Sequence, residues 1–287
     1  MTLVDVEGAT FEEGFLPQTA RRLLAEGRHR EVRELRAFLR APSATQPSGV
    51  IFHVGRCGST LVSSLVNACL GVTVIKESPF LNAVIRGHLS SGSDFGEPEV
   101  IAAARSAAAL SGKVVLKTTS WNAQVAPVLC RAFPDAPVVV LTRTAEASVA
   151  SNVRDPPGWA AYRTDRDRSA ARELWPSLGD GELTPVEFFA HAWRSTIERV
   201  LKIRSALVVD YDQFHAAPRR VIAGVWDHLR VPAPPDEAAV ESLLATDSKQ
   251  GSTFRGSIGS RDLSPEERKA IRAICAAAQA ELDERLR

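Results

Sequence analysis

The chain has 287 residues, of which 45% are hydrophobic and 24% are charged. This balance is ordinary for a globular protein that folds in water, and it excludes a disordered or collagen-like chain. The formal net charge of +1 supplies no long-range field toward nucleic acid or anionic lipid, so local groups must hold any anion that the protein binds. We therefore expect neither a nucleic-acid partner nor a membrane partner.

Residues 1–14 contain four acidic side chains and no basic one, the reverse of the positive start of an export signal. No apolar run approaches the ~18 residues that a membrane span needs, so we expect a cytoplasmic protein. The four cysteines form no C-x-x-C pair that would indicate zinc or a redox couple. We interpret three of them as apolar core residues; they are Cys69, Cys130 and Cys275.

The first 48 residues are predicted to form a helical extension and a linker, followed by one domain over residues 49–287. Pro17 to Leu39 repeats apolar side chains at helical spacing around Gly27, which predicts an amphipathic helix or a broken pair of helices. Ala41 to Gly49 is rich in proline and serine and is expected to be a loop.

Short β-branched runs alternate with helical patterns after residue 49, which predicts an α/β fold of three layers. Its central parallel sheet would have about five strands with helices on both faces, because apolar content within each run is nearly continuous. The predicted strands are Val50 to Val54, Val72 to Lys76, Lys113 to Lys117, Pro137 to Thr142 and Ala206 to Asp210. The helices between them are Ser59 to Leu70, Pro79 to Ser90, Pro98 to Leu110, Ala123 to Phe133 and Thr184 to Ile203.

The tail from Pro232 is predicted to be helical and to end in a helix over Ser264 to Arg287. Ser264 and Glu267 have the spacing of a capping box at its start. A loop rich in glycine and serine, Lys249 to Arg261, lies between the two tail helices.

The most informative segment is the strand Val50 to Val54, which is followed by a short glycine-containing loop and a helix. In a parallel sheet, ligands bind beyond the carboxyl ends of the strands. Glycines allow several backbone N–H groups to face one anion, and the start of the following helix adds the positive end of its dipole. The segment therefore predicts a phosphate-binding loop, a P-loop-like nucleotide site, formed by Gly55, Arg56, Cys57, Gly58, Ser59 and Thr60.

This loop departs from that of nucleoside triphosphatases, in which lysine follows the last glycine. Ser59 stands in that place, and the strand Pro137 to Thr142 is followed by Arg143, where a triphosphatase would offer an aspartate for magnesium. We therefore expect no metal. A tight turn without a ligand is the alternative interpretation of the loop.

Arg56-Cys57-Gly58-Ser59-Thr60 resembles the first motif of sulfotransferases that use 3′-phosphoadenosine 5′-phosphosulfate (PAPS). The second motif of that family is a strand ending in arginine with a serine eight residues later, and Arg143 and Ser151 have this spacing. The resemblance implies that these two residues hold the 3′-phosphate of the donor. A late loop that wraps the nucleotide is similar to Phe254, Arg255, Gly256 and the residues after them. Leu207 to Asp212 is similar to the family's tyrosine-acid strand end.

Sulfuryl transfer requires alignment of the acceptor, the sulfur and the leaving phosphate, together with a cation where negative charge develops. Arg56 can supply several fixed N–H donors there. Because the family often has lysine at this position, arginine implies stabilisation of charge without proton transfer. Cys57 replaces a serine of the family and gives a weaker hydrogen bond; we consider a nucleophilic role for it the minor alternative.

The acceptor needs a base, and the histidine of many cytosolic relatives is absent from the matching run, Lys117-Thr118-Thr119. Glu77 follows the second strand at a spacing similar to that of the tyrosine-sulfating branch, and is our candidate base. The alternative is that its carboxylate only caps the helix that begins at Pro79. Lys117 could orient the transferring sulfuryl group, or could be only a cation at a strand end.

Three further features have mainly structural interpretations. His53 is interpreted as a core histidine. The charged run Arg154 to Arg172 is either a lid or a solvated loop. Trp121 lines a ligand pocket or packs in the core.

The sequence thus predicts a PAPS-dependent sulfotransferase that acts on a small-molecule alcohol, phenol or amine. Two alternatives remain open: a phosphotransferase that uses the same loop for ATP, and a nucleotide-binding homologue without activity. The identity of the acceptor and the oligomeric state are left open.

Overall fold

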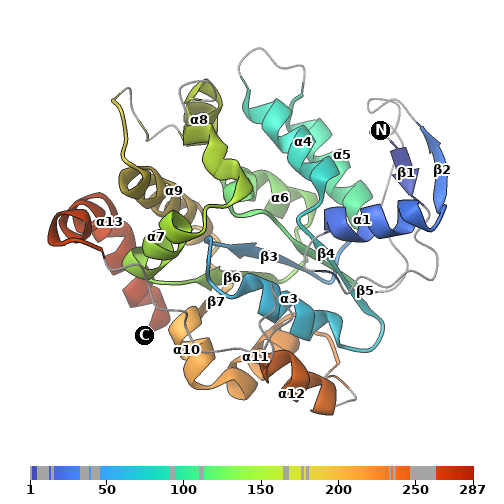
Figure 1. The fold of residues 1–287 in the computed structure, drawn as a ribbon. Helices are drawn as coiled ribbons and strands as arrows, with labels where there is room; N and C mark the ends of the chain where they lie inside the picture. The colour runs from blue at the N-terminus through green and yellow to red at the C-terminus, as the bar shows by residue number, and fades with distance from the viewer. Residues whose placement is uncertain are drawn as a thin grey trace.

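A central parallel sheet organises the protein (Figure 1). The computed structural model describes residues 2–4, 13, 16–32, 39, 46–90, 95–109, 113–163, 168–175, 178, 181–232, 234, 237–245 and 263–287. Five strands form the sheet in the order β4-β5-β3-β6-β7. Their bounds are β3 Gly49–His53, β4 Val72–Lys76, β5 Lys113–Lys117, β6 Val138–Thr142 and β7 Leu207–Asp210. The predicted five-stranded parallel sheet is therefore confirmed, with each strand end within one residue of its predicted place.

The order of the strands creates a switch point at β3. All four pairings are parallel, with β3 between β5 and β6. The chain leaves β3 toward the edge strand β4, and the later connections pass to β6 and β7 on the other side. The carboxyl end of a strand at such a reversal lies in a crevice, because the helices before and after it cover opposite faces.

Helices cover both faces of the sheet, and Figure 1 shows α3 with α10 to α12 on one side and α4 to α9 on the other. The long C-terminal helix α13 lies along α9 and α7. The bounds on the first side are α3 Ser59–Asn67, α10 Tyr211–Ala216, α11 Pro218–His228 and α12 Glu237–Ala245. The remainder are α4 Pro79–Leu89, α5 Glu97–Ala107, α6 Ala126–Ala132, α7 Ala145–Arg154, α8 Arg168–Leu174, α9 Pro185–Val200 and α13 Pro265–Leu286.

The core lies on both faces of β3 and β6, whose residues are all buried. Continuous burial explains why these strands read as unbroken apolar runs in the sequence. Trp175 and Phe188 are almost completely buried under the helices of one face. The sheet is therefore a rigid support for the loops at its carboxyl edge.

The N-terminal segment differs from the predicted helical extension. Helix α1 (Leu16–Ala25) is followed by β2 (His29–Val32), which pairs antiparallel with β1 (Thr2–Val4). The prediction of helix over His29–Val32 is wrong because Gly27, with φ 76°, ends the helix: its N–H donates to the carbonyl of Leu24. Glycine adopts this left-handed conformation without steric cost.

The predicted helix over Ala123 to Phe133 is divided into two pieces. A 3-10 helix, η1 (Ser120–Val125), precedes α6, and Pro127 stands in the first turn of α6. Proline has no N–H to continue a helix from the preceding turn, so a new helix begins there. The carboxamide of Asn122 accepts a hydrogen bond from the N–H of Thr119 at 2.9 Å, which fixes the start of η1.

The capping box predicted at the last helix is confirmed. The Ser264 hydroxyl accepts from the N–H of Glu267 at 3.1 Å, and the Glu267 carboxylate accepts from the N–H of Ser264 at 2.9 Å. Among the described residues, no helix has the length and hydrophobicity that a membrane crossing requires.

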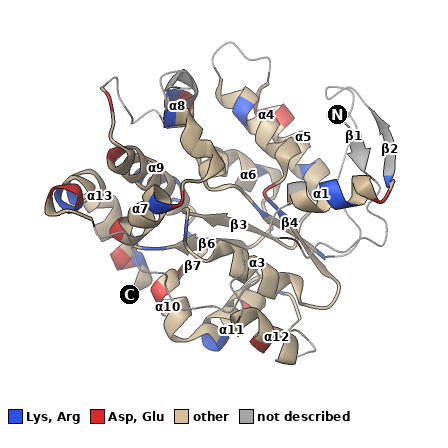
Figure 2. Ribbon diagram, viewed as in Figure 1, with Lys and Arg blue, Asp and Glu red and all other residues tan. Residues whose placement is uncertain are grey.

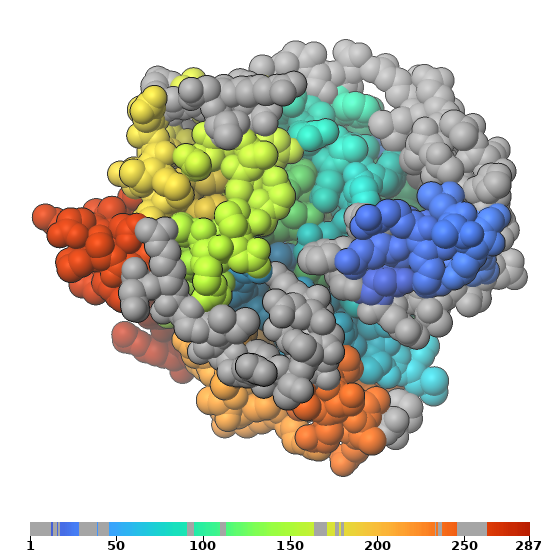
Figure 3. All heavy atoms as spheres, viewed as in Figure 1, coloured from blue at the N-terminus to red at the C-terminus, as the bar shows by residue number. Residues whose placement is uncertain are grey.

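Acidic and basic residues are interspersed over the helices around the sheet rather than gathered on one side (Figure 2). Figure 3 shows α1 on the surface of the molecule. The Lys76 ammonium at the end of β4 donates to the carbonyl of Glu13, just before that helix, at 3.0 Å.

Candidate functional site

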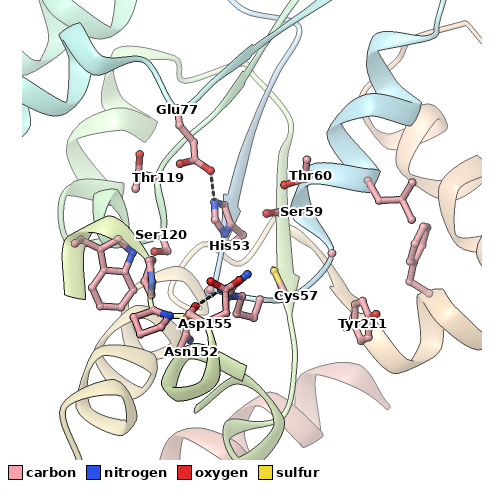
Figure 4. Close-up of a pocket in the computed structure, with 18 of the residues that line it drawn as sticks. His53, Cys57, Ser59, Thr60, Glu77, Thr119, Ser120, Asn152, Asp155 and Tyr211 are labelled. Atoms are coloured by element: carbon pink, nitrogen blue, oxygen red, sulfur yellow. Dashed lines mark hydrogen bonds and ion pairs between the residues drawn. The ribbon is translucent and has the colours of Figure 1, made fainter. Parts of the chain in front are cut away.

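A cavity of about 700 Å³ opens at the carboxyl end of β3. Its walls include the loop from Gly55 to Gly58, the start of α3, Glu77 after β4, and residues that follow α7 and β7. Figure 4 shows Ser59 and Thr60 on one side of this space and Glu77 with Thr119 on another, with His53 between them. The cavity therefore occupies the crevice that the strand order creates; we call it the β3 cavity.

The loop after β3 has an unusual backbone. Arg56 has φ 63° and Gly58 has φ 71°, so two nearly adjacent residues are left-handed. Gly58 is also the N-cap of α3 and provides no side-chain cap, and the first residues of the helix line the cavity. Left-handed backbone costs roughly 1–2 kcal/mol in a residue with a side chain, so its presence at Arg56 is a feature the surrounding fold must maintain.

Both glycines of the loop are in close contact with neighbouring side chains. A Cβ atom at Gly58 would lie 2.9 Å from the ring of Tyr211, and one at Gly55 would lie 3.0 Å from the carboxamide of Asn152. Any larger residue would push these side chains outward or deform the loop. Both glycines are thus favoured by space, and Gly58 is favoured by its backbone conformation as well.

Arg56 enters an ion pair with Asp155, which follows α7. Its Nη2 atom contacts both the carboxylate and the backbone carbonyl of Asp155, and Figure 4 shows Asp155 beside the loop. The Nε atom of Arg56 is buried and has no hydrogen-bond partner among the described residues. The Asp155 side chain is 68% exposed. The guanidinium thus has one partner near water and one donor free to bind an anion.

Cys57 is a buried thiol. Its Sγ atom lies 2.9 Å from the carbonyl of Val54, to which it donates. Burial raises the pKa of Cys57 to about 12, more than the nearby Lys117 and Arg143 cations lower it. Since the thiolate is the reactive form, this environment argues against a nucleophilic role.

Glu77 lies at the end of β4 with φ 57°, a second left-handed residue at a strand end. Its N–H donates to the carbonyl of Lys117 at 2.8 Å, and its carboxylate lies 2.5 Å from the Lys117 ammonium. The alternative that Glu77 caps α4 is wrong: the Ser78 hydroxyl does so, accepting from the N–H of Leu81 at 3.3 Å. The carboxylate therefore faces the cavity.

Lys117 contacts the Glu77 carboxylate, which in turn lines the cavity. Its side chain is 1% exposed, and it is not part of the cavity wall. A buried ammonium is stable only when it is paired, and here it fixes the position of the Glu77 carboxylate. The arrangement favours a positioning role over direct contact with a transferring group.

His53, interpreted as a core histidine, is buried but also lines the cavity. Its Nδ1 and Nε2 atoms each lie 2.9 Å from a backbone carbonyl oxygen, those of Val54 and Thr118, and Nε2 lies 3.7 Å from the Glu77 carboxylate. Burial, together with the Lys117 ammonium, lowers the pKa of His53 to about 4, against the opposing effect of Glu77. Burial thus disfavours the cation, whereas the two carbonyl contacts favour it, because a neutral ring donates to only one of them.

Arg143 and Ser151 lie behind the cavity wall. The Arg143 guanidinium stacks on Tyr211 at 4.4 Å from the ring centroid and donates to the carbonyl of Arg56 at 3.1 Å. Ser151 is buried on α7 and does not line the cavity, although its neighbour Asn152 does. Arg143 thus contacts the loop after β3 directly, and its Nε atom has no partner among the described residues.

Comparison with known proteins finds similar structures but no similar sequence. No family model matches the chain, and no curated protein does. A sulfotransferase from Alicyclobacillus acidocaldarius is similar at 15% identity over 84% of this chain and 96% of its own, with a TM-score of 0.48. The sulfotransferase domain of the Synechococcus PCC 7002 olefin synthase is similar at 17% identity, over 85% and 96%, with a TM-score of 0.48.

A third similar structure is the sulfotransferase STF9 from Mycobacterium avium, at 15% identity over 90% of this chain and 81% of its own, with a TM-score of 0.49. All three are sulfotransferases.

The predicted site residues differ in where the structure places them. Phe254, Arg255 and Gly256 lie outside the described residues. Gly55, Arg56, Cys57, Gly58, Ser59, Thr60 and Glu77 all line the β3 cavity. The structure therefore brings together the loop and the candidate base, which are separated in sequence by the whole of α3 and β4.

Sequence reasoning missed the wall residue Asn152, whereas Asp155 and Trp159, which also line the cavity, belong to the charged run that was interpreted as a lid or a solvated loop. Asn152 carries a buried Oδ1 atom without a partner among the described residues. Its position directly after Ser151 is the signal that could have identified it. Within the described part of the chain, no group of three or more His, Cys, Asp or Glu residues is arranged to hold a metal ion.

Proposed function

We propose that this protein transfers the sulfuryl group of PAPS to a hydroxyl or amine acceptor. One observation carries the proposal: an anion-binding loop with the motif Arg56-Cys57-Gly58-Ser59-Thr60 and a lysine-paired carboxylate, Glu77, open onto the same cavity. The loop would stabilise the negative charge that develops on the leaving phosphate, and the carboxylate would accept the proton of the acceptor.

The loop has the properties that a sulfated phosphate requires. No side chain caps the start of α3 at Gly58, and the Nε atom of Arg56 is a donor without a protein acceptor in the described structure. A phosphate oxygen would satisfy them with charge-assisted hydrogen bonds. Arg56 would then stabilise the charge that builds on the leaving phosphate while remaining protonated itself.

The transfer step balances without a further reactant. The acceptor oxygen or nitrogen forms a bond to sulfur while the bond from sulfur to the 5′-phosphate oxygen breaks. Glu77 takes the acceptor proton, and adenosine 3′,5′-bisphosphate leaves as the product. Lys117 stabilises the ionised form of Glu77, which is the form that accepts a proton.

The 3′-phosphate would be held by Arg143 and Ser151, as the resemblance to the family implies, with Phe254, Arg255 and Gly256 over the nucleotide. Arg143 would have to turn its guanidinium from Tyr211, whose ring it covers, or present its partnerless Nε atom. Neither motion disturbs the sheet, because Arg143 follows β6 rather than belonging to it.

Calorimetric titration with adenosine 3′,5′-bisphosphate in EDTA tests the donor site. We expect binding without metal, and we expect it to weaken at least tenfold in Arg143→Ala, since a charged hydrogen bond contributes about 1.5–3 kcal/mol. Arg131→Ala is the matched control, because Arg131 lies on α6 in an exposed pair with Glu97. Equal binding of ADP, or a requirement for magnesium, would instead favour a phosphotransferase.

Turnover of PAPS by Glu77→Gln tests the base. Loss of a general base lowers rates by roughly 10²–10⁴-fold, and we expect a decrease of this size with bisphosphate affinity unchanged. Glu97→Gln, which removes an exposed carboxylate, should retain full activity. Unchanged turnover in Glu77→Gln would assign the proton to another group, and no turnover by the wild type would indicate a binding protein without activity.

A further inference from the structure

A second cavity of about 440 Å³ lies beside the β3 cavity. The two share four wall residues, which are Glu77, Thr119, Gly158 and Trp159. The candidate base therefore stands at the junction, with the anion-binding loop on one side and the second cavity on the other. Because an in-line transfer needs the acceptor opposite the leaving group, the second cavity is placed to hold an acceptor.

Helix α4 forms one wall of this cavity along its length. Pro79, Asn82 and Arg86 all line it, and their spacing of three and four residues puts them on one face of the helix. Seven residues separate Pro79 from Arg86, so the wall extends about 10 Å at the helical rise of 1.5 Å per residue. The cavity thus has a near end at Glu77 and a far end at Arg86.

Two tryptophans give the second cavity an apolar, aromatic part of its wall. Trp121 is 6% exposed, and Trp159 is held by aromatic contacts with Trp175 at 5.2 Å and Phe189 at 5.4 Å. Both tryptophans line the cavity. Rings fixed in this way offer a preformed surface to a planar or apolar group.

The two ends carry opposite charges. Glu77 is the one acidic residue and Arg86 the one basic residue in the described wall. The Arg86 Nη1 atom donates to the Tyr162 hydroxyl at 3.0 Å, and no carboxylate among the described residues lies within ion-pair distance of Arg86. A guanidinium has five N–H donors, so further donors are available for an anion.

From these contacts we propose that the acceptor is an elongated alcohol or phenol with an apolar or aromatic body and an anionic group at the end remote from the reacting hydroxyl. Arg86 binds the anionic group, the two tryptophans contact the body, and the uncharged hydroxyl lies at Glu77, whose carboxylate repels an anion there. This inference rests on the proposed function, because it assigns the acceptor of the same reaction.

Two probes that differ only in charge test this assignment. They are 3-(4-hydroxyphenyl)propanoate and its amide, 3-(4-hydroxyphenyl)propanamide, titrated calorimetrically with and without saturating adenosine 3′,5′-bisphosphate. We expect the wild type to bind the acid about tenfold more tightly than the amide, the lower end for a charged hydrogen bond. In Arg86→Gln the two affinities should become equal, whereas Arg131→Gln should retain the preference.

Equal affinities in the wild type, a preference that persists in Arg86→Gln, or no binding of either probe at millimolar concentration would overturn the assignment. Failure of the proposed function is separate, because it would appear as absent binding of the bisphosphate. If the bisphosphate binds and both probes are sulfated at equal KM, the sulfotransferase function stands and the anion site is rejected.

Discussion

Arg56 and Glu77 have the same left-handed backbone but form ion pairs whose partners differ in exposure to solvent. Each follows a strand of the parallel sheet, each has a left-handed backbone, and each is half of an ion pair. The partner of Glu77 is Lys117, which is 1% exposed, whereas the partner of Arg56 is Asp155, which is 68% exposed.

The difference in exposure predicts a difference in rigidity. Removing one partner of a buried pair leaves an uncompensated charge away from water, so the Glu77 carboxylate has little freedom to change partners. Arg56 is 13% exposed, but solvent reaches its partner Asp155 and screens the pair, so we expect Arg56 to exchange Asp155 for a phosphate. The site would thus combine a fixed candidate base with an arginine that can change partners.

The largest effect expected from this comparison is on stability. Glu77→Gln should lower the free energy of unfolding by about 3 kcal/mol, because it leaves the buried Lys117 ammonium without its carboxylate. Adding Lys117→Met should recover much of the loss, since no charge then remains in the pair. Urea denaturation of the two single variants and the double variant measures this coupling.

The matched control is the pair of Arg131 and Glu97, whose side chains are 53% and 52% exposed. Its double-mutant cycle should give a coupling of about 0–1 kcal/mol. Equal couplings in the two cycles would contradict the distinction between a fixed and a mobile pair.

His53 is buried, as Lys117 is. Its burial leads us to expect that the stability of the protein depends on pH. Its folded pKa of about 4 lies below the ordinary value of 6.5, so the unfolded chain binds more protons between these pH values. The contribution of His53 to the free energy of unfolding is present above pH 6.5 and is lost as the pH falls to about 4. The change is about 3 kcal/mol.

Measuring unfolding of the wild type and His53→Gln from pH 7.5 to 4 isolates this contribution, which should be missing in the variant. NMR titration of the imidazole gives an independent readout. A pKa above 6.5 would show that the ring is held as a cation by Glu77 and the two carbonyl groups, and the site would then contain a further positive charge.

The sheet could be predicted from the sequence because local composition determines it. Strands buried on both faces need continuous β-branched residues, and β4 and β5 were predicted with their exact bounds. The turn after β3 could also be predicted from local sequence, because Gly58 has the left-handed backbone that favours glycine; its binding of phosphate stays a prediction. The break between η1 and α6 was missed, although Pro127 is a local signal for it.

The partners within the site could not be predicted in this way. Arg56 and Asp155 are 99 residues apart in sequence, and nothing in either segment specifies the other. The pairing of Glu77 with Lys117 depends on β4 and β5 being neighbours, with Lys76 in register with Lys117. Composition predicts strands, but the order of strands in the sheet decides which strand ends meet.

The smallest expected effect concerns the exposed pair. Asp155→Asn keeps the backbone carbonyl that Arg56 also contacts but removes the carboxylate. We expect little change in stability and a rise in affinity for adenosine 3′,5′-bisphosphate of up to about fivefold, because an exposed ion pair contributes at most about 1 kcal/mol.

Titration calorimetry of Asp155→Asn beside Glu97→Gln, which removes an exposed carboxylate from a pair on other helices, separates this effect from a general change in charge. A gain in affinity that appears only in Asp155→Asn, and that shrinks at high salt, would mean that the carboxylate competes with phosphate for Arg56. A loss of affinity would mean that Asp155 instead orients the guanidinium toward the anion, and Arg56 would then be as fixed as Glu77.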